Sequence, residues 1–141
     1  MSSKTESILL VEDNLVNQNV LSKQLQKAGF TVYVAGHGGE ALDFLRTTKF
    51  WREQSTTGLD LGIVLMDIEM PIMNGLECTR KIRELHRSGD IVSHVPIMAV
   101  SANARVEQLR MARESGMDDA IAKPFRIVEL LPKLEMLARR W

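Results

Sequence analysis

The sequence Ile8-Leu9-Leu10-Val11-Glu12-Asp13 is a short apolar run that ends abruptly in two acidic residues. Three later apolar runs have the same form, and each is followed at once by a polar residue. They are residues 63–66 before Asp67, 96–100 before Ser101 and 120–122 before Lys123. Strands that are apolar along their whole length are typical of a parallel sheet buried on both faces. The pattern therefore predicts a parallel sheet covered by helices on both sides.

Segments with helical spacing separate these runs, and the second predicted strand, 31–35, ends at a glycine. Helices are expected at residues 15–28, 40–45, 75–86, 105–115 and 126–139, so strand and helix alternate five times. Right-handed crossovers then favour an α/β, flavodoxin-like (βα)5 fold, a doubly wound five-stranded parallel sheet of order 2-1-3-4-5. We expect one domain over residues 7–138, flanked by tails at 1–6 and 139–141. The long polar segment 47–61 is predicted to extend the second helix and then form a loop.

The composition excludes several classes of protein. The chain has 141 residues, of which 45% are apolar, and 18 basic residues balance 18 acidic ones. This balance argues against a dedicated nucleic-acid binder, and the single cysteine, Cys78, cannot form an internal disulfide. The first residues lack a signal peptide, and no apolar run approaches the roughly 20 residues that cross a bilayer. We expect a cytoplasmic domain that contacts neither nucleic acid nor membrane.

The residues that follow the strands form a chemically coherent set. In open α/β sheets, ligands bind beyond the carboxyl ends of the strands. Four of these ends carry Glu12-Asp13, Asp67, Ser101 and Lys123. Three neighbouring carboxylates repel one another unless a cation is bound, and oxygen ligands suit Mg²⁺. With the lysine charge and a hydroxyl donor, the set predicts a site for phosphoryl transfer in which one carboxylate is the nucleophile.

These motifs resemble the receiver domain of two-component response regulators. The matching stretches are Glu12-Asp13, Asp67 within residues 65–75, Ser101-Ala102 and Lys123-Pro124-Phe125. The run Val11-Glu12-Asp13-Asn14 further resembles the receivers of hybrid histidine kinases. The resemblance covers about residues 7–138.

The resemblance implies a role for each matched residue. Asp67 would be the phosphoacceptor, Lys123 would pair with the aspartate or the phosphoryl group, and Ser101 would bond the phosphoryl oxygen. Mg²⁺ (or Mn²⁺) would be held by Asp13, Asp67 and the Glu69 backbone carbonyl, with Glu12 reaching the metal through water. The Lys123-Pro124 peptide bond would be cis. The implied function is to take a phosphoryl group from a phosphohistidine and relay it to a histidine phosphotransfer protein, which makes the chain a signalling domain rather than an enzyme in its own right.

Two other functions compete with this interpretation. An aspartyl-phosphate hydrolase of the haloacid dehalogenase kind would carry a D-x-D motif after the first strand, where this chain has Glu12-Asp13-Asn14. A flavin or dinucleotide binder needs a glycine-rich first turn, and this turn has no glycine.

The first helix is the expected docking surface for the kinase and for the phosphotransfer protein. Helical spacing predicts that its core stripe consists of Asn17, Val20, Leu21, Gln24, Leu25 and Ala28. The opposite residues would then be exposed beside the acidic site; they are Leu15, Gln18, Asn19, Ser22 and Gln26.

One position departs from the family pattern. Many receivers carry an aromatic residue three positions before the lysine, and its ring turns inward when the hydroxyl residue moves. The matching residue here is Ala120. A switch needs an element with two arrangements, so we expect phosphorylation to change the surface around the fourth and fifth helices very little.

Overall fold

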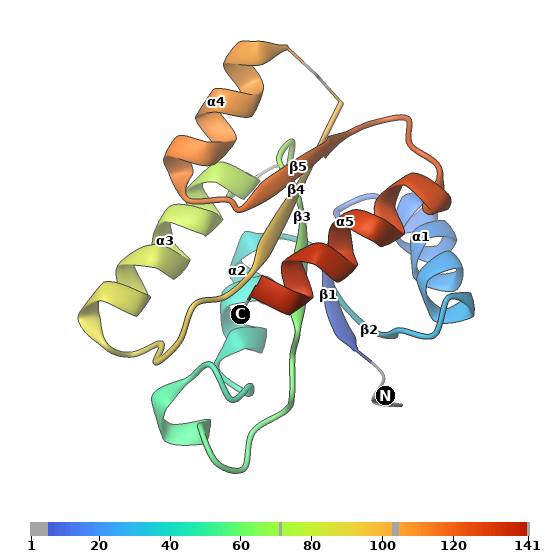
Figure 1. The fold of residues 1–141 in the computed structure, drawn as a ribbon. Helices are drawn as coiled ribbons and strands as arrows, with labels where there is room; N and C mark the ends of the chain where they lie inside the picture. The colour runs from blue at the N-terminus through green and yellow to red at the C-terminus, as the bar shows by residue number, and fades with distance from the viewer. Residues whose placement is uncertain (1–5, 71, 103–104, 141) are drawn as a thin grey trace.

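The computed structural model describes residues 6–70, 72–102 and 105–140. Five strands alternate with five α-helices along the chain, as the sequence pattern predicts (Figure 1). The strands are β1 (Ser7–Val11), β2 (Thr31–Ala35), β3 (Ile63–Asp67), β4 (Ile97–Ser101) and β5 (Asp119–Ala122). The helices are α1 (Leu15–Lys27), α2 (Gly38–Leu45), α3 (Gly75–Ser88), α4 (Val106–Ser115) and α5 (Ile127–Arg140). Within the described residues, no helix is both long enough and apolar enough to span a membrane.

The strands form one parallel sheet in the order β2-β1-β3-β4-β5, which confirms the predicted topology. The register aligns the carboxyl ends of the central strands: Val11 pairs with Met66 and Asp67 pairs with Val100. One residue further, the Lys123 amide donates to the Ser101 carbonyl at 2.7 Å. The polar residues that follow the strands are therefore brought to one edge of the sheet.

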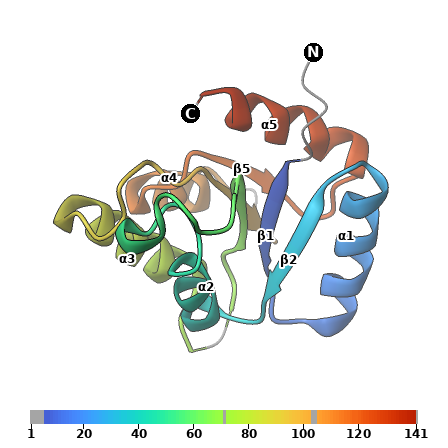
Figure 2. The same cartoon turned by 90° about the horizontal axis from the view of Figure 1, so that it is seen from below.

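Helices cover both faces of the sheet, with α1 and α5 on one side and α2, α3 and α4 on the other (Figures 1 and 2). Successive strand residues point to opposite faces, so β1 contributes Leu10 to the core under α1 and α5 and Leu9 to the core under the other helices. Both residues are at most 2% exposed. Burial on both faces explains why the strands are apolar along their whole length.

Helix α3 begins directly beside the acidic edge of the sheet. Its first turn is fixed by a capping box, in which the Asn74 side chain accepts from the Glu77 amide at 2.9 Å and Glu77 accepts from the Asn74 amide at 3.2 Å. At Gly75, a Cβ atom would collide with the Asp67 carbonyl oxygen. The glycine therefore allows the helix to start against the end of β3.

The predicted extension of α2 into the first part of residues 47–61, carrying Phe50 and Trp51, is wrong. The helix ends at Leu45, and the segment forms a short 3-10 turn at Arg52–Gln54 between two isolated β-bridges. One bridge joins Trp51 to Ile91, and the Arg52 guanidinium donates to the Gly89 carbonyl at 2.9 and 2.5 Å. The Arg52 amide donates to the Asp90 carbonyl and the Phe50 carbonyl accepts from the Val92 amide, both at 2.9 Å, so long-range bonds satisfy backbone groups that a helix would have satisfied locally. Phe50 and Trp51 are half-buried against the core, whereas most of residues 52–60 are exposed, as expected for the loop.

Helix α1 lies in a different rotation from the one predicted. Of the expected core stripe, the structure buries Leu25, half-buries Leu21 and leaves the others exposed: Asn17, Val20, Gln24 and Ala28. The prediction of exposed residues is also only partly confirmed. Leu15, Asn19 and Gln26 are exposed. Gln18 and Ser22 are half-buried on the side that faces the protein, and the Ser22 hydroxyl oxygen is buried.

The reason for this difference lies in the distribution of apolar residues around α1. Leucine and valine occur at positions 15, 16, 20, 21 and 25, which spread over most of the helix circumference at 100° per residue. The periodicity therefore does not single out one face, and packing against the sheet decides the rotation.

Candidate functional site

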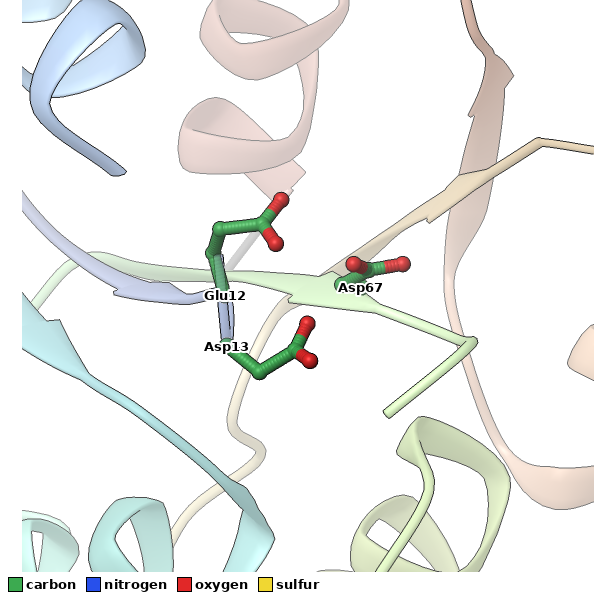
Figure 3. A group of neighbouring side chains, drawn as sticks. All are labelled: Glu12, Asp13 and Asp67. Carbon is green, nitrogen blue, oxygen red and sulfur yellow. The ribbon is translucent and has the colours of Figure 1, made fainter. Parts of the chain in front are cut away.

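Three carboxylates meet at the carboxyl edge of the sheet. Glu12 and Asp13 directly follow β1, and Asp67 is the last residue of β3. One oxygen from each of the three groups lies within 4.8 Å of the others, and Figure 3 shows the side chains converging from the two neighbouring strands. Glu12 and Asp67 are 5% and 4% exposed, whereas Asp13 is open to solvent. The predicted acidic cluster is therefore present, with one exposed and two buried members.

Asp67 is held in an environment that opposes its ionisation. Burial raises the pKa of its carboxyl group to about 6, and the neighbouring charge of Glu12 acts in the same direction. Lys123 opposes this shift, because its Nζ atom lies 3.4 Å from Asp67 Oδ2. A cation that approached Asp67 would stabilise its charged form.

Lys123 bridges the two buried carboxylates. Its ammonium group also lies 3.5 Å from Glu12 Oε1. Partial burial lowers the pKa of the ammonium group, but the charges of Asp67 and Glu12 outweigh this effect and raise the pKa above its ordinary value. Lys123 therefore stays positively charged beside Asp67. Its peptide bond to Pro124 is cis, as the family resemblance implies.

Hydrogen bonds orient Glu12 from both sides. The Asn14 amide donates to Glu12 Oε2 at 3.0 Å, and the Gln18 side-chain amide donates to the Glu12 carbonyl at 2.6 Å. Helical spacing placed Gln18 on a docking surface and gave no sign of this contact. A residue six positions away can reach this carbonyl only because α1 folds back over the loop that precedes it. The bond ties α1 to the acidic loop.

Ser101 is buried beside Asp67 and bonded to a carboxylate. Its hydroxyl donates to Glu69 Oε2 at 3.2 Å, and the Ala102 amide donates to Glu69 Oε1 at 3.0 Å. The Glu69 amide in turn donates to Asp67 Oδ1 at 3.2 Å. The family resemblance gave a role only to the Glu69 carbonyl, and the side chain was missed. No local motif signals this contact, because it joins two loops that are 32 residues apart.

The donors at this edge suit a hard divalent cation. Glu12, Asp13 and Asp67 offer carboxylate oxygens, and the Glu69 carbonyl lies two residues beyond Asp67 on the same loop. An all-oxygen set with a few carboxylates is typical of Mg²⁺ sites that also bind phosphate groups. A cation would also relieve the repulsion between the carboxylates, so the residues fit a magnesium site.

A cleft of about 290 Å³ opens beside the acidic cluster. Glu12, Asp67 and Lys123 line this cleft, together with residues of α1 and of the turn between β5 and α5. The wall residues include Asn17, Val20, Leu21, Gln24, Pro124 and Phe125. A mostly apolar cleft lined by a buried carboxylate can receive a side chain carried by another protein.

Comparison with known proteins identifies the family. Residues 8–135 match the model of the response regulator receiver domain. The chain is 38% identical, over 119 residues, to hybrid signal transduction histidine kinase I of Dictyostelium discoideum, covering 84% of this chain and 6% of that protein. It is 34% identical, over 133 residues, to the sensor histidine kinase RcsC of Salmonella typhi, covering 94% of this chain and 12% of that protein. The chain thus spans a small part of these relatives.

Solved structures agree with this assignment. The receiver domain of the sensor histidine kinase PA1611 from Pseudomonas aeruginosa has a magnesium ion in its active-site cleft. It is 32% identical to this chain and superposes with a TM-score of 0.74, over 96% of this chain and 99% of that one. The receiver domain of Ssk1 from Saccharomyces cerevisiae, solved with the phosphotransfer protein Ypd1, is 24% identical with a TM-score of 0.82, over 99% of this chain and 92% of that one. At 24% identity, the similarity to Ssk1 shows a shared fold and no more.

The match along nearly the whole chain agrees with the strand order and with the residues at the ends of the strands. Hybrid histidine kinases are among the relatives, as the sequence resemblance predicts. The chain belongs to the response regulator receiver domains of two-component signalling.

Proposed function

We propose that Asp67 is the phosphoacceptor of this receiver domain, and that it takes its phosphoryl group from a phosphohistidine. The observation that carries the proposal is the position of the Asp67 carboxylate. It is buried at the end of β3, lies 3.4 Å from the Lys123 ammonium group, and shares its surroundings with Glu12 and Asp13. A nucleophile, a fixed positive charge and a set of metal ligands are the parts that phosphoryl transfer requires.

The transfer step assigns a task to each residue. An Asp67 oxygen forms a bond to phosphorus while the bond between phosphorus and the histidine nitrogen breaks, and the imidazole keeps the electron pair of that bond. Lys123 balances the charge on the phosphoryl oxygens, and the Ser101 hydroxyl donates to one of them. Glu12, Asp13, Asp67 and the Glu69 carbonyl would hold Mg²⁺ or Mn²⁺. When bound, this ion would neutralise the carboxylates and the phosphoryl oxygens.

The cleft beside Asp67 is the proposed docking site of the partner, a helical phosphotransfer protein or a kinase core that presents its histidine. Three apolar residues of α1 are exposed near it, Leu15 at 71%, Val16 at 69% and Val20 at 54%, and of these Val20 lines the cleft. Large apolar side chains exposed around a polar site are typical of interaction surfaces. Support also comes from the yeast co-crystal structure, in which the Ssk1 receiver is paired with the phosphotransfer protein Ypd1. Of the expected docking residues, Leu15 and Asn19 remain in the proposal; Gln18 and Ser22 do not.

Labelling with acetyl phosphate and Mg²⁺ tests the acceptor directly. The wild-type protein should take up one phosphoryl group per chain, and the label should be released by hydroxylamine, which cleaves acyl phosphates. Asp67→Asn should not be labelled, because an amide is a poor nucleophile. The hydrolase alternative instead expects many turnovers on a range of phosphate esters.

Asp43→Asn provides the matched control, since Asp43 is an exposed residue of α2. It should be labelled like the wild type. Full labelling of Asp67→Asn would exclude Asp67 as the acceptor.

A further inference from the structure

We propose that the Glu69 side chain is a built-in competitor of the phosphoryl group. In the unphosphorylated protein its carboxylate accepts the hydrogen bonds of the Ser101 hydroxyl and the Ala102 amide. Ser101 ends β4, beside β3, and Ala102 follows it directly, so a phosphoryl group on Asp67 would use the same two donors. This inference rests on the proposed function of Asp67.

The backbone places the competing carboxylate at this point. β3 and β4 pair in register, with Asp67 opposite Val100, so the residues that follow each strand lie side by side. The Glu69 amide donates to Asp67 Oδ1 at 3.2 Å, which fixes the main chain of Glu69 to the acceptor itself. From there the side chain reaches the end of β4 and bonds both donors, one with each carboxylate oxygen.

Charge makes the two occupants exclusive. A carboxylate and a phosphoryl group are both anions, and two like charges that share one set of donors destabilise each other. Hydrogen bonds to a charged acceptor are also stronger than bonds between neutral groups. The phosphoryl group therefore gains these donors only after the Glu69 side chain has left them. Because Glu69 is exposed, its carboxylate can move into water when it is displaced.

A structural role for Glu69 predicts the opposite result. If the contact served only to join the loops after β3 and β4, its removal would loosen the site and weaken the binding of a phosphoryl group. If the carboxylate competes, its removal strengthens binding. The sign of the change therefore separates the two roles.

The experiment measures the affinity of beryllofluoride, a non-covalent analogue of the phosphoryl group, in the presence of saturating Mg²⁺. Glu69→Ala, which keeps the backbone carbonyl, should bind beryllofluoride about tenfold more tightly than the wild type, as expected for removal of one charge-assisted competitor. Glu69→Gln, which keeps the shape but not the charge, should also bind more tightly. Glu84→Gln removes one charge from an exposed position of α3 and should bind like the wild type.

Two further measurements identify the donors. Without beryllofluoride, the amide resonance of Ala102 should shift in both Glu69 variants and not in Glu84→Gln. In a Ser101→Ala background, which lacks one of the two donors, the gain from Glu69→Ala should be smaller than in the wild type.

The outcomes separate this inference from the proposed function. Unchanged or weaker binding by Glu69→Ala, with normal binding by the wild type, would overturn the competitor role alone. If the wild-type protein bound no beryllofluoride and accepted no phosphoryl group, the proposed function would fail and this inference with it.

Discussion

As the proposed phosphoacceptor, Asp67 must combine a buried position with the chemistry of an ionised nucleophile, and these two requirements conflict. Burial favours the neutral carboxyl group, whereas attack on phosphorus needs the carboxylate. Lys123, at 3.4 Å, offsets part of this cost but leaves the pKa of Asp67 at about 6. A bound divalent cation would offset more of it. The acidic cluster therefore reduces the stability of the metal-free protein, and the same carboxylates form a set that fits a metal ion.

This conflict predicts a pH-dependent stability. The pKa of Asp67 in the folded protein is above its ordinary value of 3.8, so the folded state binds the proton more tightly than the unfolded state does. The contribution of Asp67 to the free energy of unfolding therefore falls as the pH rises from about 4 to above 6. Without divalent metal, Asp67→Asn should be more stable than the wild type by about 2 kcal/mol at pH 7.5, and this advantage should vanish near pH 4.

Urea unfolding at several pH values in the presence of EDTA measures this difference. Asp43→Asn, at an exposed position, serves as the control and should follow the wild type. Adding Mg²⁺ should stabilise the wild type more than Asp67→Asn, because the variant lacks one ligand. A variant that is less stable than the wild type at pH 7.5 without metal would contradict this account of the site.

At the scale of elements, the two sides of helix α1 have different roles. Its inner side packs Leu25 into the core and places the Gln18 amide 2.6 Å from the Glu12 carbonyl. Its outer side exposes Leu15, Val16 and Val20, of which Val20 lines the cleft. A helix that buries so little apolar surface leaves apolar residues for a partner to cover.

Charged substitutions on the outer side should separate docking from chemistry. Leu15→Glu and Val20→Glu should slow phosphoryl exchange with a histidine phosphotransfer protein by about tenfold or more, since apolar anchors dominate such interfaces. Labelling by acetyl phosphate should stay within about twofold of the wild type, because neither side chain bonds the acidic cluster. Stopped-flow or gel-based transfer assays measure both rates.

Val92→Glu offers a matched control, because Val92 is 47% exposed in the loop before β4, at the opposite edge of the sheet. It should affect neither assay. Equal losses of transfer and of acetyl phosphate labelling in Leu15→Glu would show that the substitution had damaged the site itself.

At the scale of the whole molecule, the parallel register brings distant parts of the chain into one site. Glu12, Asp67, Ser101 and Lys123 span more than a hundred residues of sequence, yet each lies where a strand ends at the same edge. Ala120 lies in β5 opposite Ala99, beside a hollow of about 220 Å³ between α4 and β5. The Ala120 methyl group cannot transmit a movement of Ser101 to the outer surface of the molecule, as the ring of an aromatic residue could.

We therefore expect phosphorylation to leave the surface of α4, β5 and α5 almost unchanged. Amide NMR of the protein with and without beryllofluoride should show shifts confined to the loops around Asp67 and Ser101. Sedimentation should show no dimer formed on binding. Large shifts along residues 105–122 together with dimerisation would show that another side chain performs the coupling.

The sequence alone predicted the alternation of strands and helices, the order of the sheet and the acidic cluster. It could do so because strands buried on both faces must be apolar throughout, and because a polar residue at the end of such a strand must lie at the edge of the sheet. These are local consequences of burial, and they can be recognised one segment at a time.

Only the tertiary structure decided the rotation of α1, the path of residues 47–61 and the partner of Glu69. The apolar residues of α1 surround most of the helix, so packing against the sheet selected Leu25 rather than Val20 for burial. Segment 47–61 bonds to residues 89–92, and Glu69 bonds to Ser101, across gaps of more than 30 residues. Such contacts depend on where two loops meet in space, and no periodicity within either loop encodes that meeting.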